Sequence, residues 1–136
     1  MKLFIVSFVI GCLAVTSAYG LEQDPKDRLI DIHNLTANIY ALIIGLVNDL
    51  SDKKITNDIA VNKIDEWKVR YEKETSPVPP EARKMCDLMN KMLNVTRETV
   101  RDYQQDNQRT KDGLSELEGI KSDLKNAMTE LKYNIQ

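Results

Sequence analysis

The chain has 136 residues, 29% of them charged, and its 19 lysines and arginines nearly balance its 21 aspartates and glutamates, for a net charge of −2. This balance provides no basic face of the kind that neutralises phosphates, so we expect no nucleic-acid partner. The two cysteines are too few for a disulfide scaffold, and we expect a single domain whose stability comes from side-chain packing.

The first twenty residues have the pattern of a secretory signal peptide. Lys2 provides the positive charge, residues 3–15 are an apolar run, and Ala18-Tyr19-Gly20 has the small residues of a cleavage site. The run is shorter than the ~20 residues of a membrane-spanning helix, and we expect no later segment to reach that length. We therefore predict a signal peptide at residues 1–20 and a secreted, extracellular helical domain at residues 21–136. An uncleaved signal anchor is the alternative.

The first predicted helix begins after Asp24, which is suited to an N-cap, with Pro25 at the first helical position. Apolar residues then recur at spacings of three and four, which predicts a helix over residues 25–50. Its second half, IYALIIGLV (residues 39–47), is apolar on nearly every face, and this is unusual for a helix with one side in water. We expect this half to be central in the fold, or to line a ligand or a partner.

A second helix is predicted from Thr56, which can cap it, because apolar residues follow at helical spacing. Its apolar positions are Ala60, Ile64, Trp67 and Tyr71. The helix ends in TSPVPP (residues 75–80), since three prolines in four residues cannot continue it.

Residues 81–136 contain no proline, and one coiled-coil heptad pattern fits the whole segment. A single helix of this length would extend about 80 Å at ~1.5 Å per residue, and half of it would have no partner within the chain. Asp112-Gly113 offers a helix stop, followed by a capping box. We therefore predict helices over residues 81–111 and 115–133, and an all-α antiparallel bundle of three to four helices with coiled-coil-like heptads. A continuous helix, favouring a self-associating rod, is the alternative.

Two N-x-Thr sequons are candidate glycosylation sites on a secretory route. They are Asn34-Leu35-Thr36 and Asn94-Val95-Thr96. In the heptads, both asparagines fall at outward positions, so we predict N-linked glycan at Asn34 and Asn94. The alternative is that both are unmodified asparagines on helix surfaces.

Cys86 is the only cysteine outside the predicted signal peptide. Its place on the apolar stripe predicts a small buried side chain with an inert thiol. An odd cysteine in an oxidising compartment also tends to find a partner, which predicts an intermolecular disulfide and a homodimer. We expect the nearby helix N-terminus to lower the pKa of this thiol. Both interpretations stay open.

Catalytic motifs are missing from the sequence. Apart from residues 1–20 it has one histidine, His33, and it has no zinc helix, no nucleophile elbow, no Cys-x-x-Cys pair and no glycine-rich phosphate loop. We therefore predict no enzymatic activity, no cofactor and no metal site.

Several methionines and aromatic residues could serve binding, because thioethers adapt to apolar ligands and bundle cores hold ligands. The candidate apolar pocket consists of Ile43, Leu46, Trp67, Met89 and Met128. We expect a non-enzymatic binding or interaction protein that carries a small apolar ligand or presents a surface to a protein partner. The alternative is a self-associating coiled-coil structural protein, linked as a dimer through Cys86.

ITNDIAVNKIDEW (residues 55–67) and PPEARKMCDLMNKMLN (residues 79–94) together resemble the nematode SXP-type secreted antigens. Members of that family are small exported helical proteins with a threonine-capped helix that ends in tryptophan, followed by a helix start similar to SPEAK. The resemblance implies a secreted nematode protein with a cation- or lipid-binding role. It carries over no binding residue.

Overall fold

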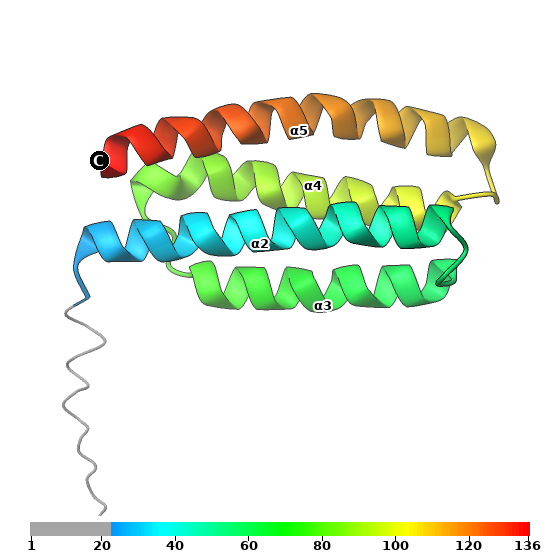
Figure 1. The fold of residues 1–136 in the computed structure, drawn as a ribbon, viewed down its shortest axis with the longest axis horizontal. Coiled ribbons are helices and arrows are strands. Elements are labelled where there is room, and N and C mark those ends of the chain that lie inside the picture. The colour runs from blue at the N-terminus through cyan, green and yellow to red at the C-terminus, as the bar shows by residue number, and fades with distance from the viewer. Residues whose placement is uncertain (1–22) are drawn as a thin grey trace, which may run out of the picture.

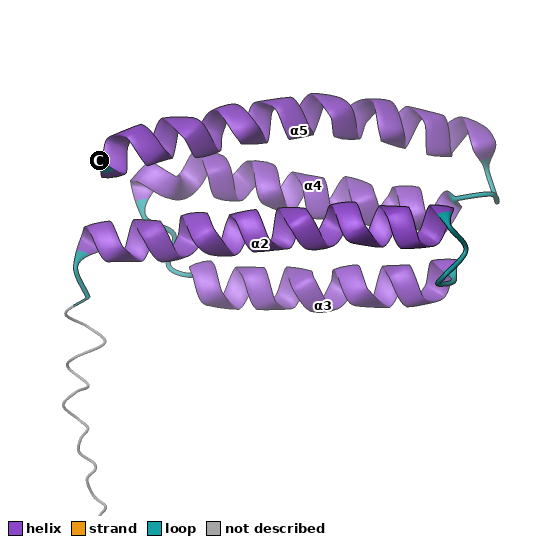
Figure 2. Cartoon of the chain, in the orientation of Figure 1, coloured by secondary structure: helices purple, strands orange, loops and turns teal. Residues whose placement is uncertain are grey.

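The structure is a computed structural model and describes residues 23–136. Four α-helices run up, down, up and down to form an antiparallel bundle (Figures 1 and 2). They are α2 (Pro25–Ser51), α3 (Asn57–Thr75), α4 (Arg83–Asp102) and α5 (Asn107–Ile135), with a short 3-10 helix, η1 (Pro80–Ala82), before α4. The predicted all-α bundle is confirmed. The predicted signal peptide lies outside the described residues.

The first two helices begin at the caps that the sequence predicts. The carboxylate of Asp24 accepts a hydrogen bond from the backbone N–H of Lys26 at 2.8 Å, and Pro25 follows at the first helical position. The hydroxyl of Thr56 accepts a hydrogen bond from the backbone N–H of Ile59 at 3.3 Å. These side chains satisfy backbone donors that a helix start leaves free, which is why both boundaries are legible in the sequence.

The predicted boundary between the last two helices is wrong. α4 ends at Asp102 and α5 begins at Asn107, so the predicted break at Asp112-Gly113 falls inside α5. The chain turns at Gln104, whose φ is 63°, and the carboxylate of Asp106 then accepts a hydrogen bond from Arg109 N at 3.0 Å. Asp106 is therefore the N-cap of the last helix.

Gly113 stands inside α5 because α4 and α5 approach each other closely there. A Cβ atom at Gly113 would overlap with the hydroxyl oxygen of Thr99 and lie 3.1 Å from the Cβ of Thr99. The glycine thus serves helix packing and does not end a helix.

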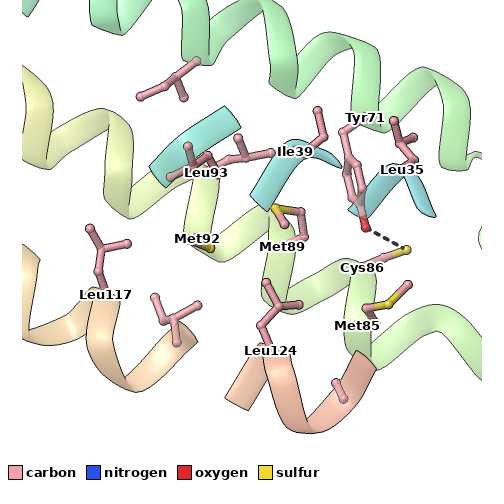
Figure 3. Close-up of a cluster of buried hydrophobic side chains, with 14 of the residues drawn as sticks. Leu35, Ile39, Tyr71, Met85, Cys86, Met89, Met92, Leu93, Leu117 and Leu124 are labelled. Carbon is pink, nitrogen blue, oxygen red and sulfur yellow. Dashed lines mark hydrogen bonds between the residues drawn. The ribbon is translucent and has the colours of Figure 1, made fainter. Parts of the chain in front are cut away.

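One apolar core runs along the centre of the bundle and receives side chains from all four helices. Ile39 from α2, Met89 from α4 and Leu124 from α5 are completely buried (Figure 3). Ile64 from α3 is completely buried as well. Heptad positions in the middle of α5, such as Leu117 and Leu124, are buried. Nearer to the turn between α4 and α5, the heptad positions Asn107 and Leu114 are exposed. The bundle is therefore better closed away from the α4–α5 turn than beside it.

Candidate functional site

The outward side of α2 is exposed, although it carries no charge. Residues 32–48 contain no Asp, Glu, Lys or Arg. Since successive residues lie about 100° apart around a helix, seven exposed residues of this segment share one side. We name them the uncharged face, and they are Asn34, Ala37, Asn38, Ala41, Leu42, Gly45 and Asn48. Along the helix, the small and apolar residues Ala41, Leu42 and Gly45 lie between Asn38 and Asn48.

The uncharged face corrects the expectation that residues 39–47 are central on all sides. Ile39, Ile43 and Leu46 are buried, but Leu42 is 40% exposed. A Cβ atom added at Gly45 would meet no other atom within 4 Å, so this position is open to solvent. The residues at positions 37, 41 and 45 are small and lie four apart, so their side chains project little from this uncharged side of the helix.

Among the described helices, only α2 has the length and the apolar composition that a membrane-spanning helix needs. The expectation that no segment after residue 20 reaches this threshold is wrong for α2. Core helices of soluble proteins and signal sequences meet the same criteria. Only 33% of the most apolar 18-residue window is buried in the bundle, so α2 has much apolar surface outside the core.

Each predicted glycosylation sequon has its asparagine on the surface and its threonine in the core. Asn34 and Asn94 are exposed, as their outward heptad positions predict. Thr36 and Thr96 are 0% exposed. The hydroxyl of Thr96 donates to the carbonyl of Met92 at 2.7 Å, and that of Thr36 lies 2.8 Å from the carbonyl of Ile32.

An open hollow of about 390 Å³ lies between α4 and α5 beside Asn94. Its lining includes Val95 and Gly113 together with charged side chains of both helices, Glu98 and Arg109 among them. Asn34 does not line the five most clearly formed hollows on the surface of the described chain. In residues 23–136, no three or more His, Cys, Asp or Glu side chains lie close enough to hold a metal ion.

Cys86 lies in the core, with its side chain 1% exposed. Its sulfur is 3.4 Å from the hydroxyl of Tyr71 (Figure 3). The Tyr71 hydroxyl is in turn 2.7 Å from the hydroxyl of Thr36. This cluster joins α2, α3 and α4 through buried polar groups. Burial raises the pKa of the Cys86 thiol, so the expected lowering by the helix N-terminus is wrong.

The location of Cys86 agrees with the interpretation of a core thiol. An intermolecular disulfide would require the sulfur to leave the core and the hydroxyl of Tyr71. Tyr71 is itself completely buried, and burial together with the nearby sulfur raises its pKa far above the usual value. The disulfide stays a prediction with no exposed sulfur to support it.

The five candidate pocket residues pack into or against the core. Ile43, Leu46 and Met89 are buried, and Trp67 and Met128 are half-buried against them. None of them lines any of the five surface hollows. A ligand at this place would have to displace packed side chains, so the ligand pocket stays a prediction.

Sequence reasoning missed two features that bear on function. The first is the low surface formed by Ala37, Ala41 and Gly45, which their spacing of four could have indicated. The second is the ion pair of Arg97 with Asp65 at 2.7 Å, which fastens α4 to α3 and lowers the pKa of Asp65 through the hydrogen bond from Arg97. No local signal in the sequence pairs these two residues, because 31 others separate them.

No protein-family model matches this chain, and no curated protein or solved structure matches it either. The resemblance to the SXP-type antigens therefore stays a prediction.

Proposed function

We propose that this protein is a secreted, non-enzymatic glycoprotein that acts as an interaction protein through the uncharged face of α2. The observation that carries the proposal is the exposure of a helix side without any charge over residues 32–48, in a chain with 29% charged residues. Solvated helix faces usually carry charged side chains. The centres of protein interfaces are depleted of charge, and the uncharged face has that composition.

The partner that this face fits best is a second copy of the chain. Small residues at positions 37, 41 and 45 let another helix come close. A two-fold symmetric interface brings identical surfaces together, so a charged face would meet its own charge. The uncharged face avoids this repulsion, and the amides of Asn38 and Asn48 can exchange hydrogen bonds with the partner copy.

A glycan on Asn34 is compatible with such a pair. Asn34 lies seven positions before Ala41 and eleven before Gly45, about 10 Å and 16 Å along the helix at ~1.5 Å per residue. Two α2 helices that cross near Ala41 and Gly45 diverge with distance from the crossing point. The glycan would then lie at the margin of the interface.

The proposal of export has three supports. They are the signal-peptide pattern of residues 1–20, the exposure of Asn34 and Asn94, and the resemblance to a family of secreted helical antigens. The alternative of a rod formed by one long C-terminal helix loses its basis, because the chain turns at residues 103–106. The uncharged face, rather than a long heptad, is the surface that we propose for self-association.

The test is the mass in solution of residues 21–136, measured by light scattering during size-exclusion chromatography. We expect the mass of a dimer for the wild type and of a monomer for Ala41→Lys, because the substitution places two ammonium groups near the symmetry axis. Val69→Lys is the matched control, since Val69 is 67% exposed on α3 and should leave the dimer intact.

Circular dichroism of the three proteins shows whether helicity is unchanged, so that loss of the dimer reports the interface and not unfolding. A wild type that stays monomeric up to its solubility limit would contradict the proposed pairing. A dimer that persists in Ala41→Lys would place the interface elsewhere.

A further inference from the structure

We infer that glycans at Asn34 and Asn94 are added only before α2 and α4 form, and that the folded protein cannot accept them. The inference rests on the proposed secretory route. It concerns the relation between each exposed asparagine and the threonine two positions later.

A sequon is recognised through two side chains. The requirement for Ser or Thr at the third position means that the transferase contacts that hydroxyl together with the asparagine amide. Two positions along an α-helix correspond to about 200° of rotation, so the two side chains point to opposite sides. In a helix packed on one side, an outward asparagine therefore requires an inward threonine.

Both sequons of this chain show this arrangement in full. Thr36 and Thr96 are 0% exposed, although their asparagines are exposed. The hydroxyl of Thr36 is held by Ile32 O at 2.8 Å and by the Tyr71 hydroxyl at 2.7 Å, and that of Thr96 by Met92 O at 2.7 Å. A transferase could reach neither hydroxyl without opening the core.

Fraying of the helix ends does not release the sequons. Asn34 lies more than two turns from the start of α2, and Asn94 more than two turns from both ends of α4. Opening of terminal turns has little free-energy cost, but opening of a central core segment approaches the cost of global unfolding. Modification of the folded protein would therefore depend on the small population of opened molecules.

The reaction itself needs a free acceptor amide. Nδ2 of the asparagine forms a bond to C1 of the first sugar of a lipid-linked oligosaccharide, the bond from C1 to the pyrophosphate oxygen breaks with its electron pair on that oxygen, and the amide loses one proton to water. The lipid pyrophosphate is the leaving group. In the unfolded chain the asparagine and the threonine can turn to the same side, and in the helix they cannot.

Each of the two threonines thus has two successive roles. Before folding, it completes a sequon, and after folding it is a hydrogen-bonded core residue. Substitution of Thr96 by Ser keeps both the sequon and the hydroxyl, whereas Thr96→Val keeps the approximate shape and removes the sequon.

The test compares acceptors in a reaction with purified oligosaccharyltransferase and lipid-linked oligosaccharide. The first acceptor is the folded, unglycosylated chain of residues 21–136, and the second is a pair of peptides that span residues 29–41 and 89–101. We expect both peptides to be modified and the folded chain to be modified at least ~100-fold more slowly, since opened molecules are a fraction of about 10⁻³ or less.

The positive control is a sequon with both side chains exposed in the folded chain. Arg109→Thr completes a sequon with Asn107 in the first turn of α5, where positions 107 and 109 are exposed. Opening of a terminal turn has little free-energy cost, so these two side chains can turn to the same side while the rest of the bundle stays folded. We expect the folded variant to accept sugar at Asn107 but not at Asn34 or Asn94. This outcome shows that the transferase is active towards folded protein and that the packed central turns of α2 and α4, with their buried threonines, prevent modification at the other two sites.

Modification of Asn34 and Asn94 in the folded chain at the rate of the peptides would overturn the inference, while leaving the proposed glycoprotein intact. Peptides that accept no sugar, in a reaction where Asn107 of the variant is modified, would overturn both, because the two sequons would then be unused in any conformation.

Discussion

Gly113 on α5 lies against Thr99 on α4 so closely that a side chain at Gly113 would overlap with the threonine hydroxyl. That hydroxyl donates to the carbonyl of Val95 at 2.8 Å. Rotation of Thr99 would not make room, because its Cβ and Cγ2 also lie within 3.3 Å of the added atom. The spacing of the α4–α5 pair therefore depends on a glycine at this position.

Gly113→Ala should destabilise the bundle, although alanine favours an isolated helix by ~1 kcal/mol over glycine. Forcing atoms into a packed site costs about 1–3 kcal/mol, so the free energy of unfolding should fall. Gly119→Ala is the matched control, because a Cβ there meets nothing within 4 Å, and it should stabilise the protein by up to ~1 kcal/mol. Urea unfolding followed by circular dichroism measures both values.

Truncation of the Thr99 side chain gives a second check on this contact. In a Thr99→Ala background, Gly113→Ala should cost less than it does in the wild type, because the hydroxyl and the methyl group of Thr99 are gone. Equal costs in the two backgrounds would mean that the strain arises elsewhere.

Gly113 also shows why one helix boundary was predicted wrongly from the sequence. Asp24, Thr56 and the prolines of residues 77–80 act on the backbone beside them, so local pattern was sufficient there. The glycine signal at position 113 arises from a contact with another helix, which no local pattern reveals. The cap at Asp106 was present in the sequence, but nothing local ranked it above the glycine.

The candidate site was predictable to a similar extent. The absence of charge from residues 32–48 is visible in the sequence, and so is the outward position of Asn34. Which side of α2 the other helices cover depends on tertiary packing, so the exposed Leu42 and Gly45 could not be distinguished from core positions. For the same reason, the sequence alone does not decide whether the sulfur of Cys86 lies at the surface or in the core.

Stability should decrease at alkaline pH because two acidic groups are buried in neutral form. The pKa of the Cys86 thiol is raised from 9.0, and that of Tyr71 is raised from 10.0. Above these values the unfolded chain loses protons that the folded chain keeps, so the unfolded state is favoured as pH rises. The stabilisation is complete below about pH 9 and should be lost above it, at up to ~1.4 kcal/mol per pH unit for each group.

Tyr71→Phe should remove the part of this decline that begins near pH 10, at a cost of about 1 kcal/mol in neutral solution from the lost hydrogen bond. The pH profile of the unfolding midpoint in urea tests this prediction. Tyr133→Phe is the control, since Tyr133 is 73% exposed and its substitution should leave the profile unchanged. A Tyr71→Phe profile that coincides with the wild type above pH 10 would show that Tyr71 ionises freely in the fold.

Leu46→Asp should unfold the chain. Leu46 is buried on the inner side of α2, and an unpaired carboxylate in that place costs several kcal/mol, comparable with the stability of a small domain. Glu116→Lys, at an exposed position of α5, should change the melting temperature little. Thermal denaturation by circular dichroism compares them, and equal melting temperatures would contradict the assignment of Leu46 to the core.

Cys86 should resist thiol-labelling reagents in the folded protein and react once the protein is denatured, because its sulfur is buried and its pKa is raised. On a denaturing gel without reductant, the secreted protein should run as a single chain, since pairing through α2 is non-covalent. A dimer band that disappears on reduction and in Cys86→Ser would establish the intermolecular disulfide instead.

The functional account depends most on the claim that this chain leaves the cell as a glycoprotein. Expression of residues 1–136 in eukaryotic cells, followed by mass spectrometry of the protein in the medium, tests that claim directly. We predict a chain that begins at Leu21 and carries N-linked glycan at Asn34 and Asn94. Glycosidase treatment should reduce the mass of the chain by the mass of both glycans. Retention of the chain in the cell with residues 1–20 attached, or secretion with both asparagines unmodified, would contradict the account.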